Sequence, residues 1–191
     1  MNLLFPAEPA YPPGFTYTPN FLSEQEELYL IKLVQGTALH PFQFQGFEAR
    51  RRVASFGFDY KFDQKRLVQG ESIPAAWQPL IRKVALFLDL DPELFKELLI
   101  TEYPAGSVIN WHRDAPPFDL IAGISLAADC SFRLRPHASS SQRRKSVFDI
   151  PVARRSLYQI SGEARTAWEH SIKPVMATRY SITLRTLRAT T

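Results

Sequence analysis

The sequence predicts a mainly β protein: a double-stranded β-helix (jelly roll) with two or three N-terminal helices packed on it. Two observations support this. After Leu98, apolar and polar residues alternate with a period of two in short runs, and turn residues separate the runs at the intervals of a sandwich or barrel. Before Leu98, apolar residues recur at helical spacing instead. We expect a single domain, because 191 residues suit one hydrophobic core.

Three segments are expected along the chain. Residues 1–20 contain five prolines and should form an extended arm laid on the body. Residues 21–97 should form a helical support with a substrate-recognition segment. Residues 98–191 should form the jelly-roll catalytic core.

The support segment carries recognisable helix signals. Ser23 stands three residues before Glu26, which is a capping-box pattern, and Gly36 is placed to end that helix. A second helix is expected over residues 75–88. Residues 41–70 are rich in aromatic and basic side chains and predict short strands and loops.

Seven alternating runs are expected to be strands of the core. They cover residues 99–103, 108–112, 120–126, 131–135, 146–150, 156–160 and 179–186. No helix-length apolar pattern follows Leu98. Residues 137–145 predict an exposed hairpin tip between two of these strands.

Composition limits the class of protein. Cys130 is the only cysteine, so no intramolecular disulfide can form. No apolar run approaches the roughly 18 residues of a membrane-spanning helix, and the apolar stretch at residues 3–5 is too short for a signal-peptide core. We expect a soluble, cytoplasmic, monomeric protein without membrane contact.

Charge is unevenly distributed. Residues 130–191 hold 12 Lys/Arg and 3 Asp/Glu, a net charge of +9, whereas residues 1–129 hold 11 bases and 16 acids, a net charge of −5. This asymmetry favours an anionic partner such as nucleic acid for the C-terminal part. A basic surface that only aids solubility would give the same pattern.

His112 and Asp114 form the first candidate metal motif. Residues two apart on a strand point to the same side, so this pair offers an imidazole and a carboxylate to one point. A third ligand must come from elsewhere, and the remaining histidines are His40, His137 and His170. His170 is the best candidate, because apolar residues flank it on both sides. Two histidines and one carboxylate leave coordination positions free, which suits iron(II).

A later strand carries a second pattern. Arg179, Ser181, Thr183 and Arg185 share one face of the predicted strand, and apolar residues occupy the other. The polar face could lie in solvent. It could equally point into the barrel, where two guanidinium groups and two hydroxyls would hold a small dicarboxylate.

Taken together, these residues resemble the AlkB-like branch of the iron(II)/2-oxoglutarate-dependent dioxygenases. The likeness covers most of residues 98–187. It runs through residues 103–106, 112–114, 123–126, 165–172 and 179–185. His170 follows Asp114 by 56 positions, and the order and spacing of the motifs carry the match. Residues 51–58 also resemble the nucleotide-recognition region that precedes the family's core.

The resemblance implies a role for each residue. His112, Asp114 and His170 would bind the iron as catalytic centre. Arg179 would hold the distal carboxylate of 2-oxoglutarate with help from Tyr103, while Arg185 would lie near its chelating end and Ser181 would add a hydrogen bond. Candidate substrate contacts comprise stacking aromatics and phosphate-binding arginines: Phe56, Phe58, Tyr60, Trp111, Arg51, Arg52, Arg143 and Arg144.

The sequence departs from the family at two positions. Thr101 stands where the family often has Asn, so we expect one weaker cosubstrate contact. Pro116 stands where some members have a further acid, so we expect no acid-dependent contact with the base there.

The implied activity is oxidative demethylation of N-alkylated bases in DNA or RNA, a nucleic acid alkylation repair reaction that uses Fe(II), 2-oxoglutarate and O₂. Two alternatives stay open from the sequence. One is a 2-oxoglutarate oxygenase that acts on a protein or small molecule. The other is a jelly-roll binding module without chemistry, against which the complete ligand set argues.

Overall fold

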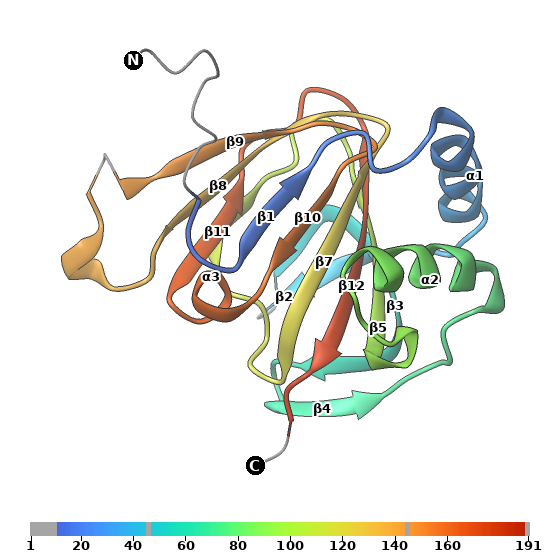
Figure 1. The fold of residues 1–191 in the computed structure, drawn as a ribbon, viewed down its shortest axis with the longest axis horizontal. Coiled ribbons are helices and arrows are strands. Elements are labelled where there is room, and N and C mark those ends of the chain that lie inside the picture. Colours follow the sequence, from blue (N-terminus) through green and yellow to red (C-terminus); the bar gives the residue numbers. More distant parts are fainter. Residues whose placement is uncertain (1–10, 45–46, 144–145, 190–191) are drawn as a thin grey trace.

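Two antiparallel sheets form the body of the molecule (Figure 1). The structure is a computed structural model that describes residues 11–44, 47–143 and 146–189. The larger sheet has the order β1-β10-β7-β12-β5-β3-β2, with β4 paired to β3. Its strands are β1 (Phe15–Thr18), β10 (Leu157–Ile160), β7 (Phe118–Leu126), β12 (Arg179–Leu187), β5 (Phe95–Tyr103), β3 (Phe47–Lys61), β2 (His40–Phe44) and β4 (Arg66–Gln69).

The smaller sheet has four strands in the order β6-β11-β8-β9. They are β6 (Ile109–His112), β11 (Trp168–Ile172), β8 (Cys130–Pro136) and β9 (Phe148–Val152). Buried side chains of both sheets pack on one another, and the rings of Phe132 on β8 and Tyr158 on β10 lie tilted against each other with their centroids 4.9 Å apart. The mainly β architecture expected from the alternating runs is therefore confirmed.

The capping box at the start of α1 (Glu24–Gln35) forms as the sequence predicts. Ser23 Oγ accepts a hydrogen bond from the Glu26 amide at 3.2 Å, and Glu26 Oε2 accepts one from the Ser23 amide at 2.7 Å. These bonds satisfy two amides that would otherwise lack partners at the helix start. Gly36 follows the last helical residue.

Helices α1 and α2 (Gln78–Phe87) lie together on the outer side of the larger sheet (Figure 1). The expected helix over 75–88 begins as a 3₁₀ turn (Ala75–Trp77) and continues as α2. Leu80, Ile81 and Val84 bury their side chains in a core that also contains Leu98 and Ile182 of the sheet. A second 3₁₀ turn (Pro92–Leu94) leads into β5. No helix in the described ranges is long and apolar enough to cross a membrane.

Strand β3 is longer than the short strands expected over residues 41–70. It runs for 15 residues and bends at Gly57, where φ is +83°. A Cβ at this position would lie 2.1 Å from the Lys96 carbonyl oxygen, so only glycine fits. Gly57 pairs with Glu97, and the next residue pairs with Gln69 of β4 instead. The bend thus carries β3 from the sheet into a hairpin over the cavity.

Four further elements lack a clear signal in the sequence. Strand β1 lies within the expected arm and pairs with β10, and the first ten residues of that arm lie outside the described residues. Strand β11 pairs with β6 and β8. The helix α3 (Gly162–Thr166) and the 3₁₀ turn Ser139–Ser141 are too short to show a periodic pattern.

Candidate active site

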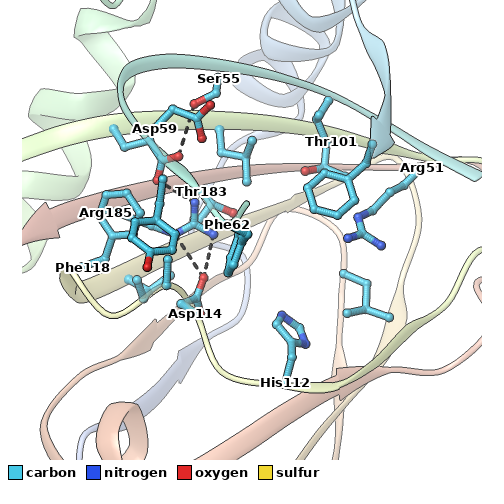
Figure 2. Close-up of a pocket in the computed structure, with 18 of the residues that line it drawn as sticks. Arg51, Ser55, Asp59, Phe62, Thr101, His112, Asp114, Phe118, Thr183 and Arg185 are labelled. Atoms are coloured by element: carbon cyan, nitrogen blue, oxygen red, sulfur yellow. Dashed lines mark hydrogen bonds and ion pairs between the residues drawn. The ribbon is translucent and has the colours of Figure 1, made fainter. Parts of the chain in front are cut away.

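A cavity of about 720 Å³ lies between the two sheets, and the β3–β4 hairpin lines its rim. His112 and His170 reach it from the smaller sheet, while Thr183 and Arg185 reach it from β12. Figure 2 shows Asp114 and Arg185 directed toward each other at one end of the cavity. Arg51 and Thr101 lie at the other end in this view.

The strand pairing brings the three expected metal ligands together. His112 ends β6 and lies directly across from His170 on β11, with ring centroids 4.2 Å apart. Asp114 follows two residues after His112, as the His-x-Asp spacing requires. Its Oδ2 lies 3.5 Å from His170 Nε2, so the two donor atoms face each other. Donors 56 positions apart in sequence therefore meet at one place.

The protonation state of these groups suits a cation. His112 Nδ1 lies 2.8 Å from the Asn110 carbonyl oxygen, which can only accept, so Nδ1 is the donor in this contact and Nε2 is the ring nitrogen left to face a metal. Burial, with the neighbouring His112, lowers the pKa of His170 to about 3, so its imidazole is neutral at physiological pH. Burial alone would raise the pKa of Asp114, but the Arg185 guanidinium outweighs it and holds that pKa well below its usual range.

Arg185 connects two buried carboxylates. Its Nη2 donates to Asp114 Oδ1 at 2.6 Å, and its Nη1 donates to Glu97 Oε2 at 2.6 Å. Ser55 on β3 donates to the other oxygen of Glu97 at 3.2 Å. Arg185 therefore occupies Oδ1 of Asp114, and Oδ2 remains available on the side that faces the histidines.

The donor set fits a divalent ion in chemical type. Two imidazoles and an ionised carboxylate match the two-histidine, one-carboxylate site of non-haem iron(II) oxygenases. Within the described ranges, no three His, Cys, Asp or Glu side chains already surround a single point as a finished metal site would. His112, Asp114 and His170 thus stay a predicted ligand set, supported by their proximity and protonation.

Arg179 places a guanidinium in the interior of the protein. Its side chain is fully buried, and its Nε donates to Ser125 Oγ at 2.9 Å. Its guanidinium lies 5.1 Å from the Tyr103 ring centroid. Neither Nη1 nor Nη2 has a hydrogen-bond partner in the described chain. A buried guanidinium fork without an acceptor is costly, so this position calls for an anion.

The polar face of β12 is buried rather than solvated. Arg179, Ser181, Thr183 and Arg185 alternate along one side of the strand, and Thr183 and Arg185 line the cavity. Ser181 is buried between Thr101 of β5 and Ser125 of β7 in the strand register. The interpretation that this face lies inside the barrel is the one the structure favours. Tyr103 lines the cavity, and its ring lies against the guanidinium of Arg179, which with Ser181 is not among the residues that line the cavity.

The expected substrate contacts divide into two groups. Arg51 and Tyr60 line the cavity. Arg52, Phe56 and Phe58 do not. Before the bend at Gly57, alternate residues of β3 point to opposite faces, which turns Arg52 and Phe56 away from the cavity.

Each of these three side chains has another partner. Arg52 donates to the Leu39 carbonyl at 2.9 Å and lies 3.6 Å from Glu102. Phe56 packs against the core beneath the helices. Phe58 is half-buried at the point where β3 pairs with Gln69 of β4. None of the three therefore meets a ligand in the cavity.

Trp111 lies outside the main cavity. It lines an adjoining groove of about 630 Å³ that shares Arg51, His112 and Arg113 with the cavity. Arg133 and Arg135 lie over its ring at 4.7 and 4.5 Å. The indole is thus held by two cations at the edge of the site.

The hairpin tip expected over residues 137–145 is only partly described. Arg143 is exposed, and its amide donates to Ser146 Oγ at 2.9 Å. Arg144 and Lys145 lie outside the described residues. The described part of this tip does not line the cavity.

Several residues of the site were not predicted from the sequence. Glu97 and Asp59 line the cavity, and the signal for Glu97 was an acid within an apolar run, which must find a cation if buried. Arg165 is buried, and its Nη2 donates to the carbonyls of Asp114 at 3.1 Å and Ala115 at 2.6 Å. It therefore fixes the loop that carries Asp114. Phe62, on the hairpin at the rim, had no distinguishing pattern.

Comparison with known families decides the class of protein. The sequence model of the 2OG-Fe(II) oxygenase superfamily matches residues 14–188. This chain belongs to that superfamily. Members of the 2OG-Fe(II) oxygenase superfamily use Fe(II), 2-oxoglutarate and O₂, which agrees with the donor set and with the buried fork of Arg179.

Curated relatives within this oxygenase superfamily confirm the AlkB-like resemblance. The chain is 29% identical over 184 residues to the alkylated DNA repair protein ALKBH8 homolog of Arabidopsis thaliana, covering 84% of this chain and 51% of the relative. It is 28% identical over 165 residues to the DNA oxidative demethylase ALKBH2 of Homo sapiens, covering 74% and 63%. The chain therefore spans less than two thirds of these relatives.

Solved structures of oxygenases share the fold. OsALKBH1 matches with a TM-score of 0.69 and 14% identity, over 92% of this chain and 98% of that one. A prolyl hydroxylase from Trichoplax adhaerens matches with a TM-score of 0.64 and 18% identity, over 91% and 83%. At these identities the likeness concerns the fold alone, and it confirms the jelly roll expected from the sequence.

Proposed function

We propose that this protein is a 2-oxoglutarate-dependent dioxygenase that removes N-alkyl groups from bases of DNA or RNA. The observation that carries the oxygenase assignment is the buried guanidinium of Arg179, whose Nη1 and Nη2 have no partner in the described chain. It lies on the same strand face as Arg185, which holds Asp114. A dicarboxylate would satisfy the first arginine while its other end reaches the metal ligands.

His112, Asp114 and His170 would hold the iron. Iron(II) bound there would supply, with O₂ and 2-oxoglutarate, the oxidation that converts 2-oxoglutarate to succinate and CO₂ and hydroxylates a substrate C–H bond. On an N-methyl group, that hydroxylation gives an N-hydroxymethyl product, which loses formaldehyde and leaves the unmodified base. Arg179 and Tyr103 would bind the distal carboxylate, and Arg185 would keep Asp114 ionised and oriented.

Nucleic acid as substrate is supported by charge and by the named relatives. A base must leave its stack to enter a cavity of this kind. The adjoining groove presents exposed Arg50 and Arg113 at the mouth, where phosphates would pass. Relatives bear the names of a DNA oxidative demethylase and of tRNA (carboxymethyluridine(34)-5-O)-methyltransferases.

The deciding experiment combines spectroscopy with turnover. The purified protein is mixed anaerobically with Fe(II) and 2-oxoglutarate, and the weak visible charge-transfer band of the chelate is recorded. Air is then admitted, and succinate and formaldehyde are measured with and without methylated oligonucleotides. We expect the band, and product that rises with the methylated oligonucleotide. A band without stimulation by any oligonucleotide would indicate an oxygenase that acts on a protein or a small molecule. Absence of iron binding would indicate a binding module without chemistry.

A further inference from the structure

Arg51 presents a cation to the inside of the cavity. Its side chain is half-buried on β3, on the same cavity wall as Val53 and Ser55. The guanidinium lies 4.0 Å from the centre of the Phe42 ring, which supports one face of it. Figure 2 shows the group directed into the cavity near Thr101, on the side of His112.

This cation has no acidic partner among the described residues. Across residues 11–44, 47–143 and 146–189, Arg51 forms no ion pair and no hydrogen bond. The other cations of the cavity are satisfied: Arg185 by Asp114 and Glu97, and Lys61 by Asp59 at 2.5 Å. Arg113 donates to the Thr166 carbonyl.

The acids of the cavity are either paired with another cation or exposed to solvent. Asp114 and Glu97 bind Arg185, and Asp59 binds Lys61. Asp63, which lines the rim, is exposed, so water and salt screen its charge. A divalent ion and the two carboxylates of 2-oxoglutarate cancel each other in charge. Loading the site therefore supplies no net anion for Arg51.

Arg51 lies deeper in the cavity than the arginines that could contact a phosphate. Arg50 and Arg113 are exposed and line the outer groove, where a phosphodiester backbone can remain in water. Arg51 lines the inner cavity as well as that groove, beside Tyr103 and Thr101. The part of a substrate that enters this far is the base itself. An arginine there donates to acceptor oxygens and repels a positive charge.

We propose that Arg51 selects neutral alkylated bases that present a carbonyl oxygen beside the alkylated ring nitrogen, such as 3-methyluracil, and discriminates against cationic ones, such as 3-methylcytosine. This inference rests on the proposed function and specifies its substrate. The two bases share a ring and a methyl position. They differ in a C4 carbonyl against an amino group, and in a neutral ring against a charged one.

The test uses two oligonucleotides that are identical except for one 3-methyluracil or one 3-methylcytosine. Formaldehyde release gives kcat/KM on each for the wild type, Arg51→Met and Arg51→Lys. Arg82→Met is the control, because it removes the same charge from an exposed site on α2. We expect the wild type to prefer 3-methyluracil. Arg51→Met should shift the ratio toward 3-methylcytosine about ten- to hundredfold, as loss of a charge-assisted hydrogen bond predicts.

Two further readouts separate the explanations. Arg51→Lys should still reject 3-methylcytosine, because it keeps the charge, while it loses part of the turnover on 3-methyluracil. The KM for 2-oxoglutarate should be the same in all variants. An equal loss on both oligonucleotides would assign Arg51 to a phosphate, and a raised KM for 2-oxoglutarate would assign it to the cosubstrate; either result overturns the proposal.

Binding of the same oligonucleotides is also measured without oxygen, by fluorescence anisotropy. This measurement distinguishes failure of base selection by Arg51 from failure of the demethylase function. Arg51-dependent preference in binding without formaldehyde release would refute the demethylase and support the selection. Demethylation without the preference, or neither demethylation nor preference, would refute the selection.

Discussion

Arg185 holds one oxygen of Asp114 with two hydrogen bonds, from Nη2 at 2.6 Å and from Nε at 3.1 Å. The two residues lie 71 positions apart in sequence: Arg185 is on β12 of the larger sheet, and Asp114 is in the loop that follows β6 of the smaller sheet. This grip leaves Asp114 Oδ2 facing His170. The arginine thus orients a metal ligand rather than only neutralising a charge.

Replacement of Arg185 should therefore weaken metal binding. Arg185→Met frees the Asp114 carboxylate to rotate, and loss of such an orienting partner commonly costs 10- to 100-fold in metal affinity. Anaerobic calorimetric titration with Fe(II) measures the change. Arg188→Met, which removes an exposed arginine three residues away, serves as control and should bind iron as the wild type does. Equal affinity in both variants would show that Asp114 needs no such support.

Loss of Arg179 should act on the cosubstrate. Arg179→Met keeps an unbranched side chain at this buried position but removes the guanidinium, whose Nη1 and Nη2 have no partner in the described chain. A charge-assisted hydrogen bond contributes about 1.5–3 kcal/mol, so the affinity for 2-oxoglutarate should fall on the order of 10- to 100-fold. Titration of the visible charge-transfer band gives the Kd. An unchanged Kd would mean that the dicarboxylate binds elsewhere.

The choice of third ligand can be tested with a pair of histidines. His170→Ala should abolish Fe(II) binding and succinate formation, because only two donors would remain. His137→Ala should leave both unchanged, since His137 is bound to Glu169 at 2.9 Å and half-exposed outside the cavity. Iron binding by His170→Ala comparable to that of His137→Ala would identify a different ligand.

Glu27 should support the fold far from the site. Its carboxylate is fully buried and accepts hydrogen bonds from Arg154 and from the Ala127 amide at 2.9 Å. Glu27→Gln should lower the free energy of unfolding by about 2 kcal/mol, measured by urea denaturation. Glu24→Gln is the matched control, because Glu24 is 82% exposed and lies 3.6 Å from Arg155, so it should change stability by less than about 0.5 kcal/mol.

The effect of Glu27 should depend on pH in a defined direction. Burial would raise the pKa of Glu27, but the hydrogen bonds from Arg154 and Ala127 outweigh it and lower the pKa below the ordinary value. The unfolded chain therefore binds a proton more readily than the folded one at this position. Its contribution is complete above the ordinary glutamate pKa and is lost as the pH falls through the folded value. The stability gap between wild type and Glu27→Gln should narrow in acid; a constant gap would contradict this.

The sequence by itself determined the class of fold and the chemical inventory. Period-two runs after Leu98 and the Ser23–Glu26 capping box depend on local backbone geometry, so they could be recognised without a partner strand. The His-x-Asp spacing and the alternation from Arg179 to Arg185 are likewise local. For that reason His112, Asp114 and the polar face of the last strand could be identified locally, whereas His170 as third ligand and the burial of the arginines depend on contacts between distant strands.

The tertiary structure decided which side chains share the cavity. The bend at Gly57 and the register of β3 place Arg51 inside the cavity but Arg52 and Phe56 outside it, although all three lie within six residues. Glu97 became a site residue only because β5 lies beside β12 and brings it to Arg185. Such pairings join residues far apart in sequence, and their register depends on the packing of both sheets, which no local pattern records.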